Sequence, residues 1–160
     1  MKEIQLTKGY VALVDDEDFE RVNQFKWCAD VHPHTVYGTR SVRTPEGKKT
    51  TQSLHRFVSG VTDPETEVDH KDHNGLNCQR YNLRPCTHQQ NLCSRQKLKG
   101  VSQFKGVSWD YNKWRAEIKL NGKTVVLGRY VSENEAAAAY KDAAVQHFGE
   151  FTNTAFKELQ

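Results

Sequence analysis

Short stretches of alternating apolar and polar positions run through the first 60 residues, and each predicts a small element. Residues 4–14 bend at Gly9 and predict a strand pair. Asp15 then stands at the N-cap of a helix over residues 16–24, whose acidic first turn suits the helix dipole. Further strands are predicted over 25–29, 36–43 and 48–54, with a turn at 44–47 and a short helix over 54–58 that ends at Gly60.

The segment around residues 66–95 is polar and predicts a strand, a loop, a strand and a helix. The first strand ends at Asp69-His70, and Asn74-Gly75 predicts a turn after it. Tyr81 to Arg84 read as a second short strand, which Pro85 stops. Thr87 then stands as the N-cap of a polar helix, with Gln90 placed as in a capping box.

The last third of the chain predicts a three-stranded antiparallel sheet covered by one helix. The strands are expected over 104–110, 113–121 and 123–130, and Asn121-Gly122 is a strong hairpin signal. Ser132 and Glu135 form a capping box that opens a helix running to Phe148. The strand over 113–121 has one apolar face, formed by Trp114, Ala116, Ile118 and Leu120. Its other face is polar and is formed by Lys113, Arg115, Glu117 and Lys119. The helix has an apolar stripe that is expected to cover the apolar face: Ala137, Tyr140, Ala144 and Phe148. The overall expectation is an α+β chain with small cores.

Composition narrows the class of protein. Of the 160 residues 36% are hydrophobic, which suits small cores better than one large one. No apolar run approaches the roughly 18 residues of a membrane span, and no signal-peptide pattern opens the chain. We therefore expect a cytoplasmic protein that does not enter a membrane.

Charge is unevenly distributed along the chain. Residues 1–70 carry 9 Lys/Arg and 12 Asp/Glu, whereas residues 71–160 carry 14 and 8. Residues 80–129 hold 11 Lys/Arg against only Asp110 and Glu117. Such a block is typical of a polyanion-binding surface, although charge alone does not separate it from a solvated lysine-rich face.

The cysteines Cys28, Cys78, Cys86 and Cys93 form no Cys-x-x-Cys pair, so a disulfide framework is not expected in a cytosolic protein. The last three could hold zinc with His73 or His88. Their spacing fits no common zinc pattern, so we do not expect structural zinc.

The order of Asp69, His70, Asn82 and Asn91, with Asn82 twelve residues after His70 and Asn91 nine further, resembles the HNH homing endonucleases of phages. Residues 12–18 and 54–58 also look like that family, so the resemblance covers about residues 1–95. It implies a ββα-metal motif over 66–95 of a nuclease domain. A DNA-binding regulator with an inactive nuclease half, and a zinc-stabilised nucleic-acid-binding module, remain as alternatives; loss of any of these four residues would have favoured the regulator.

The resemblance implies a role for each of these residues. Asp69 and Asn91 would bind one Mg²⁺ or Mn²⁺ ion, which suits their oxygen ligands. His70 would be the general base, because its pKa lies near working pH. Asn82 would tie the loop and hold His70 in one tautomer. Adjacent strand residues face opposite sides, so Asp69 and His70 must lie where the strand breaks into the loop.

Residues 103–156 are similar to the plant ethylene-response-factor (Apetala-type) DNA-binding domain. The similarity rests on Lys105-Gly106-Val107, on residues 114–118 and 135–140, and on Leu127-Gly128 and Phe148-Gly149. It implies DNA contacts at Lys105, Lys113, Glu117 and Lys119, and Arg115 shares their face. Ser108 and Val126 stand where the plant domains have arginine and tryptophan, so the target preference does not carry over.

Residues 96–102 are a basic connection, and Arg95, Lys97 and Lys99 could track phosphates or form a soluble spacer. The sequence as a whole predicts a metal-dependent homing endonuclease that nicks or cuts double-stranded DNA. No protein partner is predicted, and the target site and oligomeric state stay open.

Overall fold

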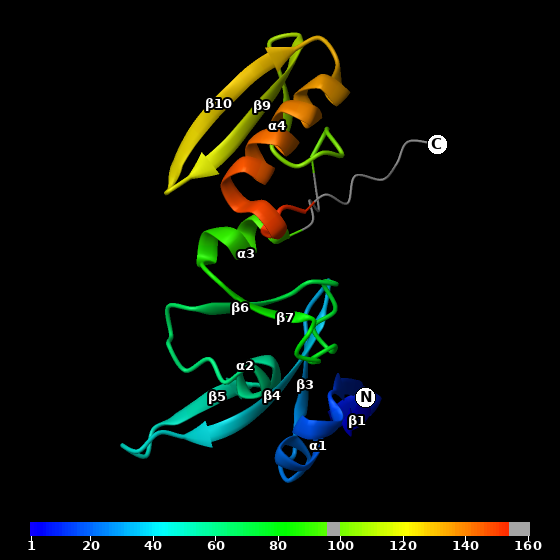
Figure 1. Ribbon diagram of the computed structural model, residues 1–160, viewed down its shortest axis with the longest axis vertical. Coiled ribbons are helices and arrows are strands. Elements are labelled where there is room, and N and C mark those ends of the chain that lie inside the picture. The colour runs from blue at the N-terminus through cyan, green and yellow to red at the C-terminus, as the bar shows by residue number, and fades with distance from the viewer. Residues whose placement is uncertain (96–99, 154–160) are drawn as a thin grey trace. The chain divides into compact units, whose positions relative to one another are not determined.

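The computed structural model describes residues 1–95 and 100–153, and Figure 1 shows small antiparallel sheets combined with short helices. The α+β class expected from the sequence is confirmed. The backbone divides into two compact units, Met1–Thr87 and His88–Gln160. Lys97 and Lys99 lie outside the described residues. Within the described ranges, no helix has the length and apolar character needed to cross a bilayer.

The first unit holds three small antiparallel sheets and short helices. The sheets are β1 (Lys2–Gln5) with β2 (Val11–Val14), then β3 (Cys28–Val31), β4 (Val36–Arg43) and β5 (Lys49–Ser53) in that order, then β6 (Glu67–His70) with β7 (Leu83–Cys86). The helices are η1 (Thr7–Gly9), α1 (Asp16–Asn23) and α2 (Leu54–Ser59). The predicted strand pair around Gly9, the β4–β5 hairpin and the helix ending at Gly60 are confirmed.

The core of the first unit is built from alternate strand residues and the apolar faces of two short helices. Val14, Val22 and Leu54 are fully buried, and Trp27 is 2% exposed. The buried indole satisfies its polar atom, because Trp27 Nε1 donates to Val22 O at 3.0 Å. Gly38 lets α2 approach β4 closely, since a Cβ there would lie 3.0 Å from Leu54 Cδ2. The core therefore fixes α2 against the sheet.

One local prediction in this unit is confirmed only in position, and another is wrong. Asp15 occupies the N-cap position of α1, but its carboxylate makes no capping bond and instead accepts from Gln79 Nε2 and Arg80 N. Pro85 does not stop the second strand of the motif, because it lies inside β7 opposite Val68. An edge strand tolerates proline where the missing N–H would face away from its neighbour.

The second unit is a three-stranded antiparallel sheet covered by one long helix. Its strands are β8 (Val107–Asp110), β9 (Lys113–Leu120) and β10 (Lys123–Tyr130), with β9 central. The helix α4 (Glu133–Phe148) opens with the predicted capping box of Ser132 and Glu135. Ala116 and Ile118 of β9 are buried, as are Ala137, Tyr140 and Ala144 of α4, so the predicted apolar faces are confirmed.

Two short helices complete the second unit: α3 (His88–Ser94) and η2 (Gly149–Phe151). Cys93 of α3 is 5% exposed and joins the cluster of Ile118, Tyr140 and Ala144. The sequence predicts that this helix belongs to a nuclease domain over residues 1–95, and that boundary stays a prediction. In the structure the compact division falls after Thr87, and the buried face of α3 packs within the second unit.

Candidate active site

The end of β6 places Asp69 and His70 side by side at the point where the strand gives way to a loop. Both are buried, with 7% and 5% of their surface exposed. Asp69 lies opposite Arg84 of β7, whose Nε and terminal nitrogen donate to Oδ2 at 3.0 and 2.8 Å. The cross-strand pair balances the buried charge of the carboxylate.

The ring of His70 is surrounded by groups from three other segments. Its centroid lies 5.0 Å from that of His55 on α2 and 5.9 Å from that of Tyr37 on β4. Burial lowers the pKa of His70 to about 4, although Asp72 and Asp69 act in the opposite direction. His70 is therefore neutral near pH 7, and its pKa lies below the near-neutral value expected from the sequence.

Cys78 bears on which ring nitrogen of His70 carries the proton. Its buried sulfur lies 4.0 Å from His70 Nε2 and 3.9 Å from Gly75 O. Burial raises the pKa of the Cys78 thiol to about 12, so the sulfur keeps its proton. The thiol donates its proton to Gly75 O. The sulfur can then accept a hydrogen bond from His70 when the ring carries its proton on Nε2. His70 Nδ1 has no hydrogen-bond partner within residues 1–95 and 100–153.

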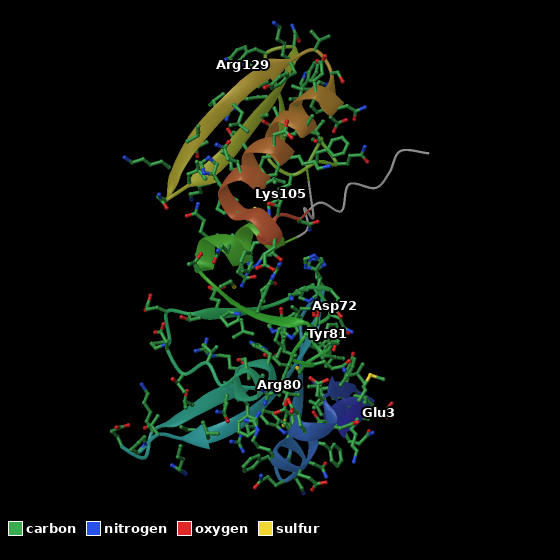
Figure 2. The ribbon with its side chains drawn as sticks, in the orientation of Figure 1. Glu3, Asp72, Arg80, Tyr81, Lys105 and Arg129 are labelled. Carbon is green, nitrogen blue, oxygen red and sulfur yellow. The ribbon has the colours of Figure 1, made fainter. Side chains whose placement is uncertain are left out.

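Asn82 closes the loop that joins β6 to β7. The side chain is 1% exposed; its Oδ1 accepts from Asp72 N at 3.0 Å, and its Nδ2 donates to Asp72 Oδ1 and Asn77 O. Burial raises the pKa of Asp72, but bonds from Asn74, Asn77 and Asn82 outweigh this and lower it. Asn77 Nδ2 also donates to Asp72 and lies 3.2 Å from Tyr81 Oη, and Figure 2 shows Asp72 and Tyr81 near each other. No bond between Asn82 and His70 is seen, so Asn82 acts on the loop backbone.

The same loop is fastened to α1 and β2 as well. Asp18 of α1 is 1% exposed and accepts from Arg80 Nε and a second guanidinium nitrogen at 2.7 and 2.9 Å, and from Arg21. The bond from Arg80 holds the pKa of Asp18 below its usual value. Leu13 of β2 exchanges backbone bonds with Leu76 and Cys78, each 2.8 Å long. These contacts fix the loop at Leu76, Cys78 and Arg80.

Gly75 allows this loop to lie against β4. A Cβ at this position would be 2.6 Å from both the Tyr37 ring and Val36 O. Its amide donates to Thr35 Oγ1 at 3.2 Å. Gly75 therefore packs closely against Tyr37, whose ring also lies near those of His55 and His70.

The fourth predicted site residue, Asn91, lies half-buried on α3 in the second unit. The first unit brings together Asp69 and His70, and Asn82 organises the loop behind them.

In the second unit, the predicted DNA-contacting residues differ in what they do. Lys113 and Lys119 of β9 are exposed. Arg115 pairs with Glu117 and approaches Asp110, to which Arg129 also donates, at 2.9 Å. Arg95 is exposed at the end of α3. This sheet face is a network of mixed charge with free cations along it.

Lys105 is engaged within the protein. Its ammonium donates to the carbonyls of Leu92, Cys93 and Arg95 at 2.5, 2.8 and 2.9 Å, so it caps the C-terminal end of α3. Burial lowers the pKa of Lys105. Figure 2 shows it beside α3 and α4, away from Arg129 at the other end of the unit.

The chain is 30% identical over 149 residues to an uncharacterized HNH endonuclease of Acanthamoeba polyphaga mimivirus, with 90% of this chain and 74% of the relative aligned. The chain belongs to the HNH endonuclease family. No family model matches it.

Several features of the site in this HNH endonuclease are not predicted by its sequence. The contact of His55 with His70 and the bonds from Arg80 to Asp18 join residues far apart in the chain. The sulfur of Cys78 approaches His70 from within the loop that follows β6. In the sequence, the acidic residues 15–18 predict the start of a helix, and they do not indicate that Asp18 accepts hydrogen bonds from Arg80. No group of three or more His, Cys, Asp or Glu side chains that could hold a metal occurs in the described part of the chain.

Proposed function

We propose that this HNH endonuclease hydrolyses phosphodiester bonds of double-stranded DNA with the help of one divalent cation. The observation that carries the proposal is the state of His70: a buried, neutral imidazole beside the Asp69 carboxylate, with an unpartnered Nδ1. A general base must be unprotonated before it takes a proton, and histidine is the side chain that most often has this role.

In the proposed reaction, His70 Nδ1 takes a proton from a water molecule that attacks phosphorus. The bond to the 3′-oxygen breaks and this oxygen takes a proton from solvent, which leaves a 5′-phosphate and a 3′-hydroxyl end. Asp69 and Asn91 offer carboxylate and amide oxygens, the ligands that Mg²⁺ and Mn²⁺ prefer. The bound cation would neutralise charge on the phosphate and on the departing oxygen. Arg84 keeps the Asp69 carboxylate in place on the strand.

Asn82 contributes through the loop. By fixing Asp72 and Asn77 it holds the backbone that follows His70, including Lys71, whose amide donates to Asn82 O at 2.9 Å. The fixed loop backbone holds His70 in one orientation at the end of β6. Fixed orientation of the reacting groups contributes a large part of catalysis.

The second unit is the proposed targeting element, an Apetala-type sheet that would place Lys113 and Lys119 against DNA. A three-stranded sheet with exposed cations can enter a major groove. The proposed biological role is that of a homing endonuclease acting in the cytoplasm of a host cell.

The test is to incubate the protein with supercoiled plasmid and with genomic DNA, adding Mg²⁺, Mn²⁺ or excess chelator. We expect nicked or linear products with either metal and none with chelator, and no products with His70→Ala. His34→Ala, a change at an exposed histidine of the same unit, is the matched control and should cut like the wild type. Binding without cutting in both metals would favour a DNA-binding regulator instead.

A further inference from the structure

Arg40 of β4 lies in a cluster of aromatic side chains. Its guanidinium carbon is 3.5 Å from the centroid of the Phe25 ring, 5.0 Å from that of Phe57 and 5.2 Å from that of Trp27. Phe57 belongs to α2, which packs against β4 (Figure 1). Arg40 Nε donates to Gln52 Oε1 of β5 at 2.9 Å. The rings and this bond together hold the guanidinium in one orientation.

No carboxylate balances this cation. Arg40 has no ion pair within the described residues, and burial, which is the cause of the shift, lowers its pKa. By contrast, Arg21 lies 4.8 Å from the centroid of the same Phe57 ring and pairs with Asp18. The absence of a partner is unexpected, because residues 1–70 carry more acidic than basic side chains. A partly desolvated cation without a partner is unfavourable, and a bound anion would offset that cost.

The terminal nitrogens of Arg40 are open to a ligand. Nη1 and Nη2 make no hydrogen bond within the part of the chain that the structure describes, and the protein does not enclose them. Phe25, on which the guanidinium stacks, is itself 37% exposed. The two nitrogens present the planar fork that binds two oxygens of a phosphate. Because the fork is already held in place, little side-chain entropy is lost when an anion binds.

We propose that Arg40 is an anion-binding residue of the first unit, and that its ligand is a phosphate of the DNA backbone. This inference rests on the proposed function, which brings duplex DNA to the unit that carries Asp69 and His70. A phosphate contact of this kind positions the duplex and reads no sequence. It also releases counterions when DNA binds, so the contact contributes to the salt dependence of affinity.

The test measures the affinity of the full-length protein for a short duplex at several salt concentrations, in excess chelator so that no cleavage is needed. Arg40→Met keeps an apolar chain over the rings and removes the charge and the fork. We expect it to bind roughly 5- to 10-fold more weakly at about 0.1 M salt, with a log–log slope reduced by about 0.9. Arg40→Lys keeps the charge without the fork, so it should retain the slope and bind more weakly than the wild type.

The matched control is Lys8→Met, which removes one exposed positive charge elsewhere in the first unit and should bind DNA like the wild type. Melting curves check that each variant is folded at the assay temperature, and Arg40→Gln replaces Arg40→Met if the latter does not fold. An Arg40→Met protein with wild-type affinity and slope would overturn the inference and leave Arg40 with a packing role. An equal loss in Lys8→Met would also overturn it, because net charge would then explain the effect.

A second arm separates a DNA phosphate from a free phosphate ion. Inorganic phosphate, added at constant ionic strength, should leave the melting temperature of the wild type unchanged relative to Arg40→Met. A rise in the wild type only, with DNA affinity independent of Arg40, would assign the site to a small anion and overturn the inference. If DNA binding depends on Arg40 but the protein never cuts, the proposed cleavage falls and the inference stands. If the protein cuts DNA and Arg40→Met binds like the wild type, only the inference falls.

Discussion

The loop between β6 and β7 and the outer face of the β8–β10 sheet hold polar side chains in opposite ways. In the loop, Asn82 is 1% exposed and bonds to Asp72 and Asn77, and Asp18 of α1, which is also 1% exposed, accepts from Arg80 of the loop. On the sheet, Arg129 is about half exposed and shares Asp110 with Arg115, while Lys113 and Lys119 project into solvent. Buried networks fix geometry, whereas exposed ion pairs contribute little stability and exchange partners readily. The first arrangement suits catalysis, and the second suits a charged ligand.

The largest effect should come from the base itself. His70→Ala should lower the cleavage rate by roughly 10²–10⁴-fold, because the proton acceptor is lost. DNA affinity should change little, since the exposed cations of the sheet are untouched. Cleavage kinetics measure the loss of rate, and a filter-binding measurement on the same preparation measures DNA affinity. A variant that cuts DNA near the wild-type rate would refute the assignment of His70 as the base.

Asn82→Ala should act on stability as well as on rate. It removes three side-chain bonds and leaves Asp72 and Asn77 O short of partners in a buried loop. We expect a loss of about 3 kcal/mol in the free energy of unfolding, measured with urea. Asn134→Ala, at an exposed position on α4, is the control and should cost little. An Asn82→Ala protein that is as stable as the wild type would show that the loop is not organised in this way.

The β8–β10 sheet and the surroundings of His70 also differ in how well the sequence predicts them. Strand alternation and the Ser132–Glu135 capping box are local signals, so the second unit was predicted nearly element by element. The surroundings of His70 were not, because His55 and Cys78 meet it only through the tertiary fold. Pro85 was misread because sequence alone does not tell an edge strand from a strand end. Lys105 looked like a surface cation until α3 supplied three carbonyls for it.

Charge reversal on the sheet should affect binding without affecting the fold. Lys113→Glu together with Lys119→Glu should weaken DNA binding and reduce its dependence on salt, because each lost phosphate contact changes the log–log slope by about 0.9. Titrations at several salt concentrations measure the slope. Lys26→Glu on the first unit is the control for net charge. An unchanged slope would mean that another surface holds the DNA.

Acid should destabilise the first unit through its buried histidines. Burial lowers the pKa values of His55 and His70 to about 3 and about 4, whereas the unfolded chain titrates near 6.5. The unfolded state therefore binds more protons between those values, and stability falls as the pH drops from about 6.5 toward 4. Melting curves across this range should show a smaller drop for His55→Phe than for the wild type. Parallel curves for the two proteins would contradict the buried, neutral state of His55.

The smallest effect separates two roles for Lys105. If this side chain serves mainly as the cap of α3, Lys105→Met should lower the stability of the full-length protein by about 1–2 kcal/mol, since charge-assisted bonds to three carbonyls are lost at a helix C-terminus. DNA affinity and its salt slope should then stay at wild-type values. Lys113→Met is the matched variant, because its side chain is exposed and has no hydrogen bond or ion pair among the described residues. It should leave stability unchanged and reduce the slope by about 0.9. A Lys105→Met protein with normal stability and a reduced slope would instead make Lys105 a phosphate contact, and the resemblance to the plant domain would then extend to that residue.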